Sequence, residues 1–150
     1  MKIIHFLILA TFIISGFSSP TMIEIDGIMF TVDHSGIPPV DEYSVAEFVD
    51  GVFIAHNTLA GKYFTDRATI HYADGQVKEY QAIETIILQA IDPYDPATKY
   101  TDGVYVYTSD DIHYRIFTKG DATFATCYDF NGQVGWGRKF IVMKEVINGR

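Results

Sequence analysis

The sequence predicts a single, mainly β domain of the sandwich or small-barrel kind, and three observations favour this fold class. Short apolar runs alternate with turn signals at close spacing along most of the chain. Aromatic residues make up 15% of the sequence, and aromatic and β-branched side chains favour strands. With 150 residues, of which 48% are hydrophobic and 20% charged, the chain is long and apolar enough to bury the core of one domain.

The N-terminal segment, residues 1–20, predicts an export signal. Lys2 supplies a positive start, residues 3–17 form a nearly unbroken apolar run, and small or turn-forming residues follow at 18–20. As a helix this run would span roughly 22 Å, whereas a bilayer core needs about 30 Å. We therefore expect a cleaved signal peptide, with an uncleaved membrane anchor as the second interpretation and a buried helix as the third. The folded domain is expected over 21–150, extracellular or anchored to the outer face of the cell membrane.

In the first half of this domain, Asp-Gly pairs mark the turns. Asp26-Gly27 divides two extended pieces within 22–32, and Asp74-Gly75 divides strands at 68–72 and 77–82, because both residue types tolerate the positive φ of tight hairpin turns. Between the two hairpins, the sequence predicts a loop at 34–39, a short helix or a loop at 42–49, an apolar strand at 51–55 and a turn at 57–61. The second hairpin arm continues through 83–91, either as a long bent strand or as a strand that breaks into a helical turn.

The second half of the domain is predicted to be mostly strands. Residues 92–101 contain two Asp-Pro dipeptides, which predict a loop or a capped short helix. Strands are predicted at 104–107, 112–118, 122–127 and 138–146, with a turn at 119–121. Together with the first half this gives about eight short strands and little helix.

The charge of the chain limits its partners. The formal net charge is -8, and the 11 Lys and Arg residues are scattered along the sequence. Nucleic-acid binding needs clustered basic residues against phosphates, so nucleic acid is not an expected partner. The same acidic excess disfavours adhesion to anionic membranes or wall polymers.

The only cysteine, Cys127, stands at the end of a predicted apolar strand. An exported chain with one cysteine has no internal disulfide, so the thiol is either buried and inert or accessible and reactive. Taken alone, Cys127 is better explained as a small buried hydrophobe. A Gly-rich loop at 128–137 follows it, and Arg138 then opens the next predicted strand. A thiol and a guanidinium on adjacent strands can lie side by side, and cysteine chemistry then needs only a base.

Among the histidines, His56 is the best candidate for that base. It ends the most apolar strand of the chain, just before a turn, where functional side chains tend to stand. His34 lies in a predicted loop, and His71 and His113 lie in predicted strands with alternating polar residues, where a solvent-facing histidine is usual. His5 belongs to the export signal.

The order of these residues resembles that of the sortases, the cysteine transpeptidases of bacterial surfaces. The matching segments are VFIAHN at 52–57, FATC at 124–127 and WGRKFIV at 136–142, with further likeness at 61–66 and 70–82. The resemblance covers roughly 45 to 145. Phe124 stands where the family often has Leu, and the loop of 10 residues between Cys127 and Arg138 leaves little wall for a groove on that side.

The resemblance implies a closed eight-stranded β-barrel with one or two short helices and a catalytic group at one end of a groove. Cys127 would form a thioester with a sorting-signal peptide of a surface protein, His56 would transfer protons, and Arg138 would hold the substrate carbonyl or the developing oxyanion. Asn57 would either orient His56 or simply suit the turn. Thr126 would support the site or simply fill the core, since its side chain should point away from that of Cys127. The acceptor would be water or an amine, such as a cell-wall precursor or a pilin lysine.

No cofactor is expected. A loop cluster of aspartates could bind calcium, but solvated turn residues explain it better. These residues are Asp92, Asp95, Asp102, Asp110 and Asp111.

Other functions make different demands on the sequence. Exported transpeptidases that cross-link peptidoglycan have a His and a Gly beside the cysteine, which Cys127 lacks, and a papain-type hydrolase would place its cysteine before its histidine. A non-catalytic secreted barrel that binds a small ligand is the alternative of a different class. It requires a buried, inert Cys127 far from His56.

Overall fold

The computed structural model describes residues 20–37, 43–55, 66–92, 94–95, 99–130 and 133–147. All but the last residue of the expected export signal at 1–20 lie outside these residues, as do His56, Asn57 and the predicted turn at 57–61. Within the described part of the chain, no helix has both the length and the apolar character needed to cross a membrane.

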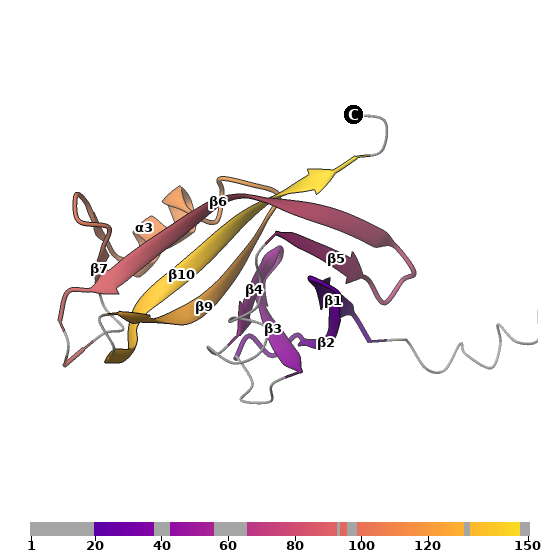
Figure 1. Cartoon of the computed structure of the whole chain (residues 1–150), viewed down its shortest axis with the longest axis horizontal. Coiled ribbons are helices and arrows are strands. Elements are labelled where there is room, and N and C mark those ends of the chain that lie inside the picture. Colours follow the sequence, from indigo (N-terminus) through magenta and orange to yellow (C-terminus); the bar gives the residue numbers. More distant parts are fainter. Residues whose placement is uncertain are drawn as a thin grey trace, which may run out of the picture.

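Eight strands close into a barrel, which confirms the predicted fold class (Figure 1). The strand order is β10-β9-β4-β3-β2-β1-β5-β6, and β6 pairs with β10 to close the sheet. Two short strands, β7 and β8, extend the sheet from β6, and the described residues contain one short helix, α3. The bounds are β1 Met22–Ile25, β2 Ile28–Asp33, β3 Ser44–Val49, β4 Val52–Ala55, β5 Arg67–His71, β6 Val77–Ala90, β7 Tyr100–Thr101, β8 Val106–Tyr107, α3 Ser109–Arg115, β9 Ala122–Phe130 and β10 Gln133–Val146.

Both predicted Asp-Gly hairpins form. Asp26 and Gly27 adopt φ values of 48° and 92° between β1 and β2, which is the positive-φ pair of a tight hairpin turn. Between β5 and β6, Gly75 has a φ of 92° and the Asp74 carboxylate accepts the backbone N–H of Gln76 at 2.9 Å. The second arm continues as a single 14-residue strand, β6, so the long-strand interpretation of 83–91 is correct.

Two predicted elements are wrong. The segment expected to be a short helix or a loop at 42–49 contains strand β3, which runs parallel to β2 and antiparallel to β4. The strand predicted at 112–118 is mostly helix α3, followed by a turn, so His113 lies on a helix. A capping box fixes the helix start: the Thr108 hydroxyl accepts the N–H of Asp111, and the Asp111 carboxylate accepts the N–H of Thr108.

The ends of β9 and β10 also differ from the prediction. The expected loop at 128–137 is largely strand, because β9 continues to Phe130 and β10 begins at Gln133. Cys127 and Arg138 therefore lie inside a long hairpin and not at strand ends. The register of this hairpin is irregular between Gln133 and Gly137.

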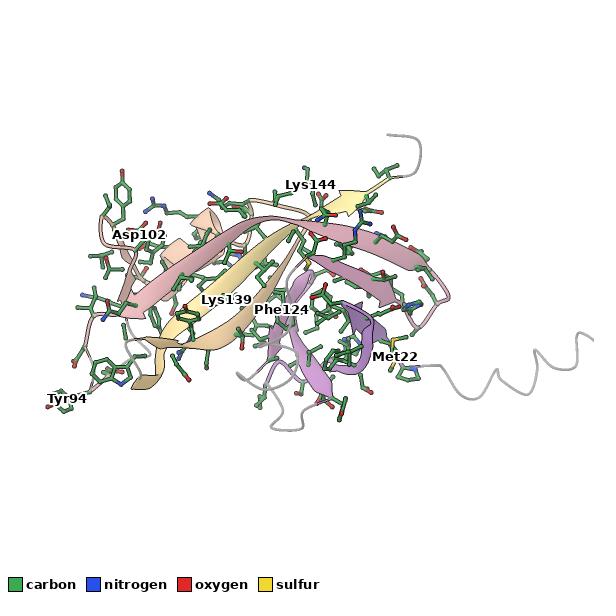
Figure 2. The ribbon with its side chains drawn as sticks, viewed as in Figure 1. Met22, Tyr94, Asp102, Phe124, Lys139 and Lys144 are labelled. Carbon is green, nitrogen blue, oxygen red and sulfur yellow. The ribbon has the colours of Figure 1, made fainter. Side chains whose placement is uncertain are left out.

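Two apolar clusters occupy opposite faces of the β9–β10 hairpin. The first, the interior cluster, fills the barrel and includes Phe53 and Met143. It also includes Phe124, which is labelled in Figure 2. The second, the outer cluster, lies on the other face beneath α3 and includes Leu88, Ile112 and the pair Ala125 and Phe140, together with Tyr100, Tyr107, Ile116 and Ala90. Side chains alternate between faces along each strand, so residues 123, 125 and 127 share the outer face.

Candidate active site

A cavity of about 460 Å³ opens on the outer face of the hairpin, and both Cys127 and Arg138 line it. The rest of its wall comes from β3, β4, β7, β9, β10 and α3, and from the turn that follows α3. The other lining residues are Phe48, Ile54, Ala55, Tyr100, Ser109, Ile112, Phe117, Ala125, Thr126 and Phe140. Most of these side chains are apolar, so the thiol and the guanidinium face a largely non-polar space.

The register of β9 on β10 brings the thiol and the guanidinium together. Cys127 and Arg138 are directly opposite each other in the antiparallel ladder. The Cβ atoms of such a pair lie about 4.5–5.5 Å apart, on the same face of the sheet. Cys127 is a free cysteine and is partly buried, whereas the ligand-binding alternative requires a fully buried thiol.

Strand β4 forms the other side of this region. It runs parallel to β9 with Ile54 opposite Ala125 and Ala55 opposite Thr126. The last described residue of β4, Ala55, is thus paired with the residue just before Cys127. His56 and Asn57 follow in the sequence but lie outside the described residues, so their predicted roles stay predictions.

Thr126 is buried, with 4% of its surface exposed, and lines the cavity. Its Oγ1 has no hydrogen-bond partner within the described part of the chain. By strand alternation its side chain leaves the sheet on the face opposite to Cys127, as expected from the sequence.

The contacts of Arg138 include a hydrogen bond and a cation–π contact. Its Nη1 donates a hydrogen bond to the carbonyl oxygen of Gly137 at 2.9 Å. Its guanidinium carbon, Cζ, lies 5.3 Å from the ring centroid of Tyr100, within the range of a cation–π contact. Burial raises the pKa of Tyr100 above 10.0, the guanidinium of Arg138 opposes that shift, and the neighbouring thiol of Cys127 adds to it. Sequence reasoning missed Tyr100, since nothing in the local pattern links β7 to Arg138.

The apolar wall over the hairpin comes from α3 and the residues after it. Ile112 and Phe117 line the cavity, and the rings of Phe117 and Phe140 meet edge to face with centroids 6.0 Å apart. Sequence reasoning missed this wall, because 112–118 was predicted to be a strand. The Thr108-x-x-Asp111 spacing is a helix-start signal that could have found it.

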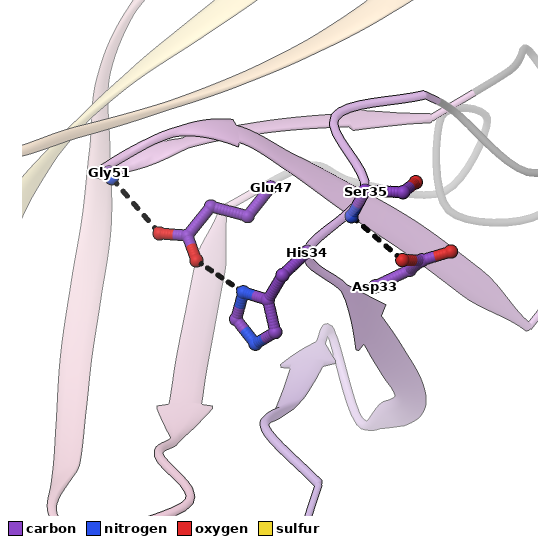
Figure 3. A network of polar contacts seen from close by, with 5 residues as sticks. All are labelled: Asp33, His34, Ser35, Glu47 and Gly51. Carbon is purple, nitrogen blue, oxygen red and sulfur yellow. Dashed lines mark hydrogen bonds and ion pairs between the residues drawn. The ribbon is translucent and has the colours of Figure 1, made fainter.

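At the far end of β4, a polar contact fixes the turn that enters this strand (Figure 3). One carboxylate oxygen of Glu47 lies 3.0 Å from Nδ1 of His34, and the other accepts the N–H of Gly51 at 3.2 Å. Gly51 has a φ of 81°, and its carbonyl accepts the N–H of Thr123 at 2.8 Å. The start of β4 is thereby tied to both β3 and β9.

The other described histidines do not line the cavity. His34 contacts Glu47, His71 on β5 lies 3.7 Å from Glu24, and the His113 ring packs edge to face on Phe117 with centroids 6.0 Å apart. The sequence argument passed these three residues over, but it expected His113 on a strand, whereas His113 lies on helix α3.

Three of the five aspartates considered for calcium accept hydrogen bonds from backbone N–H groups. Asp92 accepts the N–H of Tyr94, Asp102 accepts the N–H groups of Val104 and Tyr105, and Asp111 caps α3. In the ranges that the structure describes, no group of three or more potential metal ligands comes together.

Comparison with known proteins adds information at the level of the fold. No protein-family model and no curated protein sequence matches the chain. Several solved structures do match. Sortase C1 of Streptococcus agalactiae in complex with MTSET shares 13% identity at a TM-score of 0.55, covering 89% of this chain and 72% of that one.

Two further structures give similar values. A lid mutant of sortase A from Corynebacterium diphtheriae shares 12% identity at a TM-score of 0.54, covering 95% of this chain and 79% of that one. Sortase C from Clostridium perfringens SM101 shares 14% identity at a TM-score of 0.50, covering 87% and 72%. The chain therefore has a sortase-like fold, which confirms the resemblance seen in the sequence at this level.

Proposed function

We propose that this sortase-like domain is a cysteine transpeptidase that cleaves a sorting-signal peptide bond in surface proteins and transfers the acyl group to an amine or to water. The observation that carries the proposal is the pairing of Cys127 with Arg138 across two strands, at an apolar-walled cavity of a sortase-like barrel. A partly exposed lone thiol beside a permanent cation is the environment in which cysteine acts as a nucleophile.

In the proposed reaction, the Cys127 thiolate attacks the carbonyl carbon of the scissile peptide bond. The tetrahedral intermediate collapses to a thioester on Cys127 as the C–N bond breaks, and the departing amine takes up a proton. An incoming amine, or water, then attacks the thioester, loses a proton and releases the Cys127 thiolate. Two proton transfers are therefore needed at nearly the same place.

His56 is the proposed proton carrier for both steps: it donates to the departing amine and accepts from the incoming nucleophile. It is bonded directly to Ala55, and Ala55 is paired with Thr126, the residue before Cys127. The proposal requires the two-residue alternation of β4 to continue past Ala55, so that position 56 shares the face of Ile54, a cavity-lining residue. Asn57 is proposed to orient His56.

Arg138 is proposed to stabilise the oxyanion. Its guanidinium is charged at every working pH, and a fixed cation at the position where negative charge develops lowers the barrier most in a site from which water is excluded. The buried hydroxyl of Thr126 is proposed as a supporting group.

The proposed partners follow from this chemistry. The acyl donor is a sorting-signal peptide of a surface protein, and the acceptor is an amine such as a cell-wall precursor or a pilin lysine. No cofactor takes part. Residues 1–20 are proposed to direct export as a signal peptide or membrane anchor, and 21–150 to form the domain outside the cell.

The test is covalent labelling of the purified protein with a thiol-reactive mimic of a sorting-signal peptide. Wild type should be labelled at Cys127, and Cys127→Ala should lose all labelling while keeping the thermal unfolding curve of a folded barrel. In the same experiment His56→Ala should accept the label but lose turnover of sorting-signal peptides by about 100-fold or more. Labelling that persists in Cys127→Ala, or full turnover in His56→Ala, would contradict the assigned roles.

A further inference from the structure

Tyr100 lies at the junction of three features: the cavity, the outer cluster and the guanidinium of Arg138. It is 5% exposed, and it lines the cavity together with Cys127 and Arg138. The guanidinium carbon of Arg138 stands 5.3 Å from the centroid of its ring. Nothing in the reaction proposed above uses this side chain.

Arg138 donates a hydrogen bond from Nη1 to the Gly137 carbonyl, and its guanidinium carbon also lies within cation–π range of the Tyr100 ring. An aromatic face holds a cation without supplying a negative charge, so it does not neutralise the guanidinium. A carboxylate in the same place would compete with any oxyanion for the donors.

The backbone around Tyr100 holds the ring firmly. Tyr100 pairs with Ala90 on β6 and with Tyr107 on β8. The turn between β7 and β8 is closed by Asp102, which accepts the N–H of Tyr105 at 2.8 Å and the hydroxyl proton of Tyr107 at 3.1 Å. The ring is therefore presented by a braced hairpin and not by an isolated loop.

We propose that Tyr100 is a positioning residue that holds the Arg138 guanidinium beside the Cys127 thiol. The inference rests on the proposed function in so far as Arg138 acts there. A long arginine side chain with many rotamers would lose conformational entropy on binding the oxyanion. The contact with Tyr100 restricts the side chain already in the free protein, so less entropy is lost in the reaction. Because burial raises the pKa of Tyr100 above 10.0, the ring stays a neutral phenol at neutral pH and does not become a competing anion.

The test measures where the positive charge stands, using the folded full-length domain and two thiol reagents of opposite charge. An anionic and a cationic methanethiosulfonate each transfer a thioalkyl group to the Cys127 thiolate, forming a mixed disulfide and releasing methanesulfinate. A guanidinium held beside the thiol speeds the anionic reagent and slows the cationic one. The ratio of the two rate constants, at fixed pH and low salt, therefore reports the position of Arg138.

Tyr100→Leu should lower this ratio by about fivefold, towards the value of Arg138→Ala, and Tyr100→Phe should keep the wild-type ratio because it keeps the ring face. In the Arg138→Ala background, Tyr100→Leu should change nothing further. An unchanged ratio in Tyr100→Leu, or an equal drop in the Arg138→Ala background, overturns the proposal.

A matched control is available in the turn between β7 and β8. Arg115 stacks on Tyr105 with its guanidinium carbon 5.0 Å from the ring centroid, and neither residue lines the cavity. Tyr105→Leu should leave the reagent ratio unchanged. If Tyr100→Leu fails to fold, pentafluorophenylalanine at position 100 keeps the ring shape but reverses its quadrupole, and it should lower the ratio in the same way.

The experiment separates this inference from the proposed function. If the ratios change as expected but no sorting-signal peptide is turned over, Tyr100 positions Arg138 and the assigned reaction is wrong. If peptides are turned over but the ratio of rate constants does not change in Tyr100→Leu, the proposed reaction is supported and the positioning role of Tyr100 is wrong.

Discussion

The two faces of the β9–β10 hairpin are built from alternating residues of the same strands, yet they differ in almost every physical respect. The inner face contributes Phe124, Ile141 and Met143 to the interior cluster, all of them at most 2% exposed. The outer face contributes Ala125 and Phe140 to the outer cluster, and beyond them Cys127 and Arg138 line an open cavity. One face is sealed by the barrel, and the other is only partly covered by α3.

This difference separates stability from chemistry along a single pair of strands. The sealed face packs against buried side chains from all eight strands of the barrel. Changes on this face should therefore act on the free energy of unfolding. The open face keeps a thiol and a cation accessible and leaves apolar surface partly uncovered. The folded domain tolerates this exposure because its main core lies inside the closed barrel. Changes there should act on reactivity first.

The largest expected effect lies on the sealed face. Phe124 is 0% exposed, and Phe124→Ala should lower the free energy of unfolding by about 3–5 kcal/mol because it removes a buried ring and leaves a cavity. The same truncation on the open side, Phe48→Ala, starts from a cavity-lining ring that is 52% exposed and should cost less than about 1 kcal/mol. Urea unfolding of both variants checks the contrast, and equal losses would show that the two faces do not divide in this way.

The next effect lies on the open face and should leave stability intact. Arg138→Lys should reduce turnover of sorting-signal peptides by about 100-fold, since lysine lacks the planar fork and stacks less well on Tyr100. Arg115→Lys makes the same chemical change on α3, where the arginine stacks on Tyr105 and Tyr107 outside the cavity lining. It should leave turnover unchanged. Unchanged turnover in Arg138→Lys would remove Arg138 from the reaction.

The division between the faces also explains what the sequence could predict. Local signals placed the Asp-Gly hairpins, and runs of apolar residues placed β4, β6 and the cores of β9 and β10. The sortase resemblance added the closure of the barrel, which no local pattern encodes because it depends on β6 meeting β10 across 42 residues of intervening chain, 91 to 132. The pairing of Cys127 with Arg138 was predicted from order alone and is present, although within strands and not at their ends.

The sequence predictions that were wrong concern mainly the elements around the open face. Strand β3 carries two exposed apolar residues, Phe48 and Val49, so its alternation is weak and it was expected to be a helix or a loop. The helix α3 was missed because the apolar residues at 112–118 fit both the two-residue period of a strand and the 3.6-residue period of a helix. The capping box, which favours the helix, was not considered. Tyr100 was missed because it meets Arg138 through space, from a two-residue strand.

The smallest effect concerns the cover of the open face and depends on pH. Hydrogen bonds from the Thr108 backbone and hydroxyl, with help from Arg115, hold the pKa of Asp111 below its usual 3.8. Since the folded pKa is lower than the unfolded one, the capping box stabilises α3 fully above pH 3.8, and this contribution disappears as the pH falls through the folded pKa. Asp111→Asn should therefore lower the Tm slightly at about pH 6, and the difference from wild type should shrink as the pH falls below 3.8.

The matched control is Asp110→Asn, which removes a carboxylate from the same helical turn but not from the capping box. It should lower the Tm less at about pH 6, since it loses only the favourable charge near the helix N-terminus. In the same samples, fluorescence of a probe on α3 should report loosening of the helix at low pH before the barrel unfolds. A helix and barrel that melt together at every pH would mean that the cover of the open face is as firmly held as the sealed one.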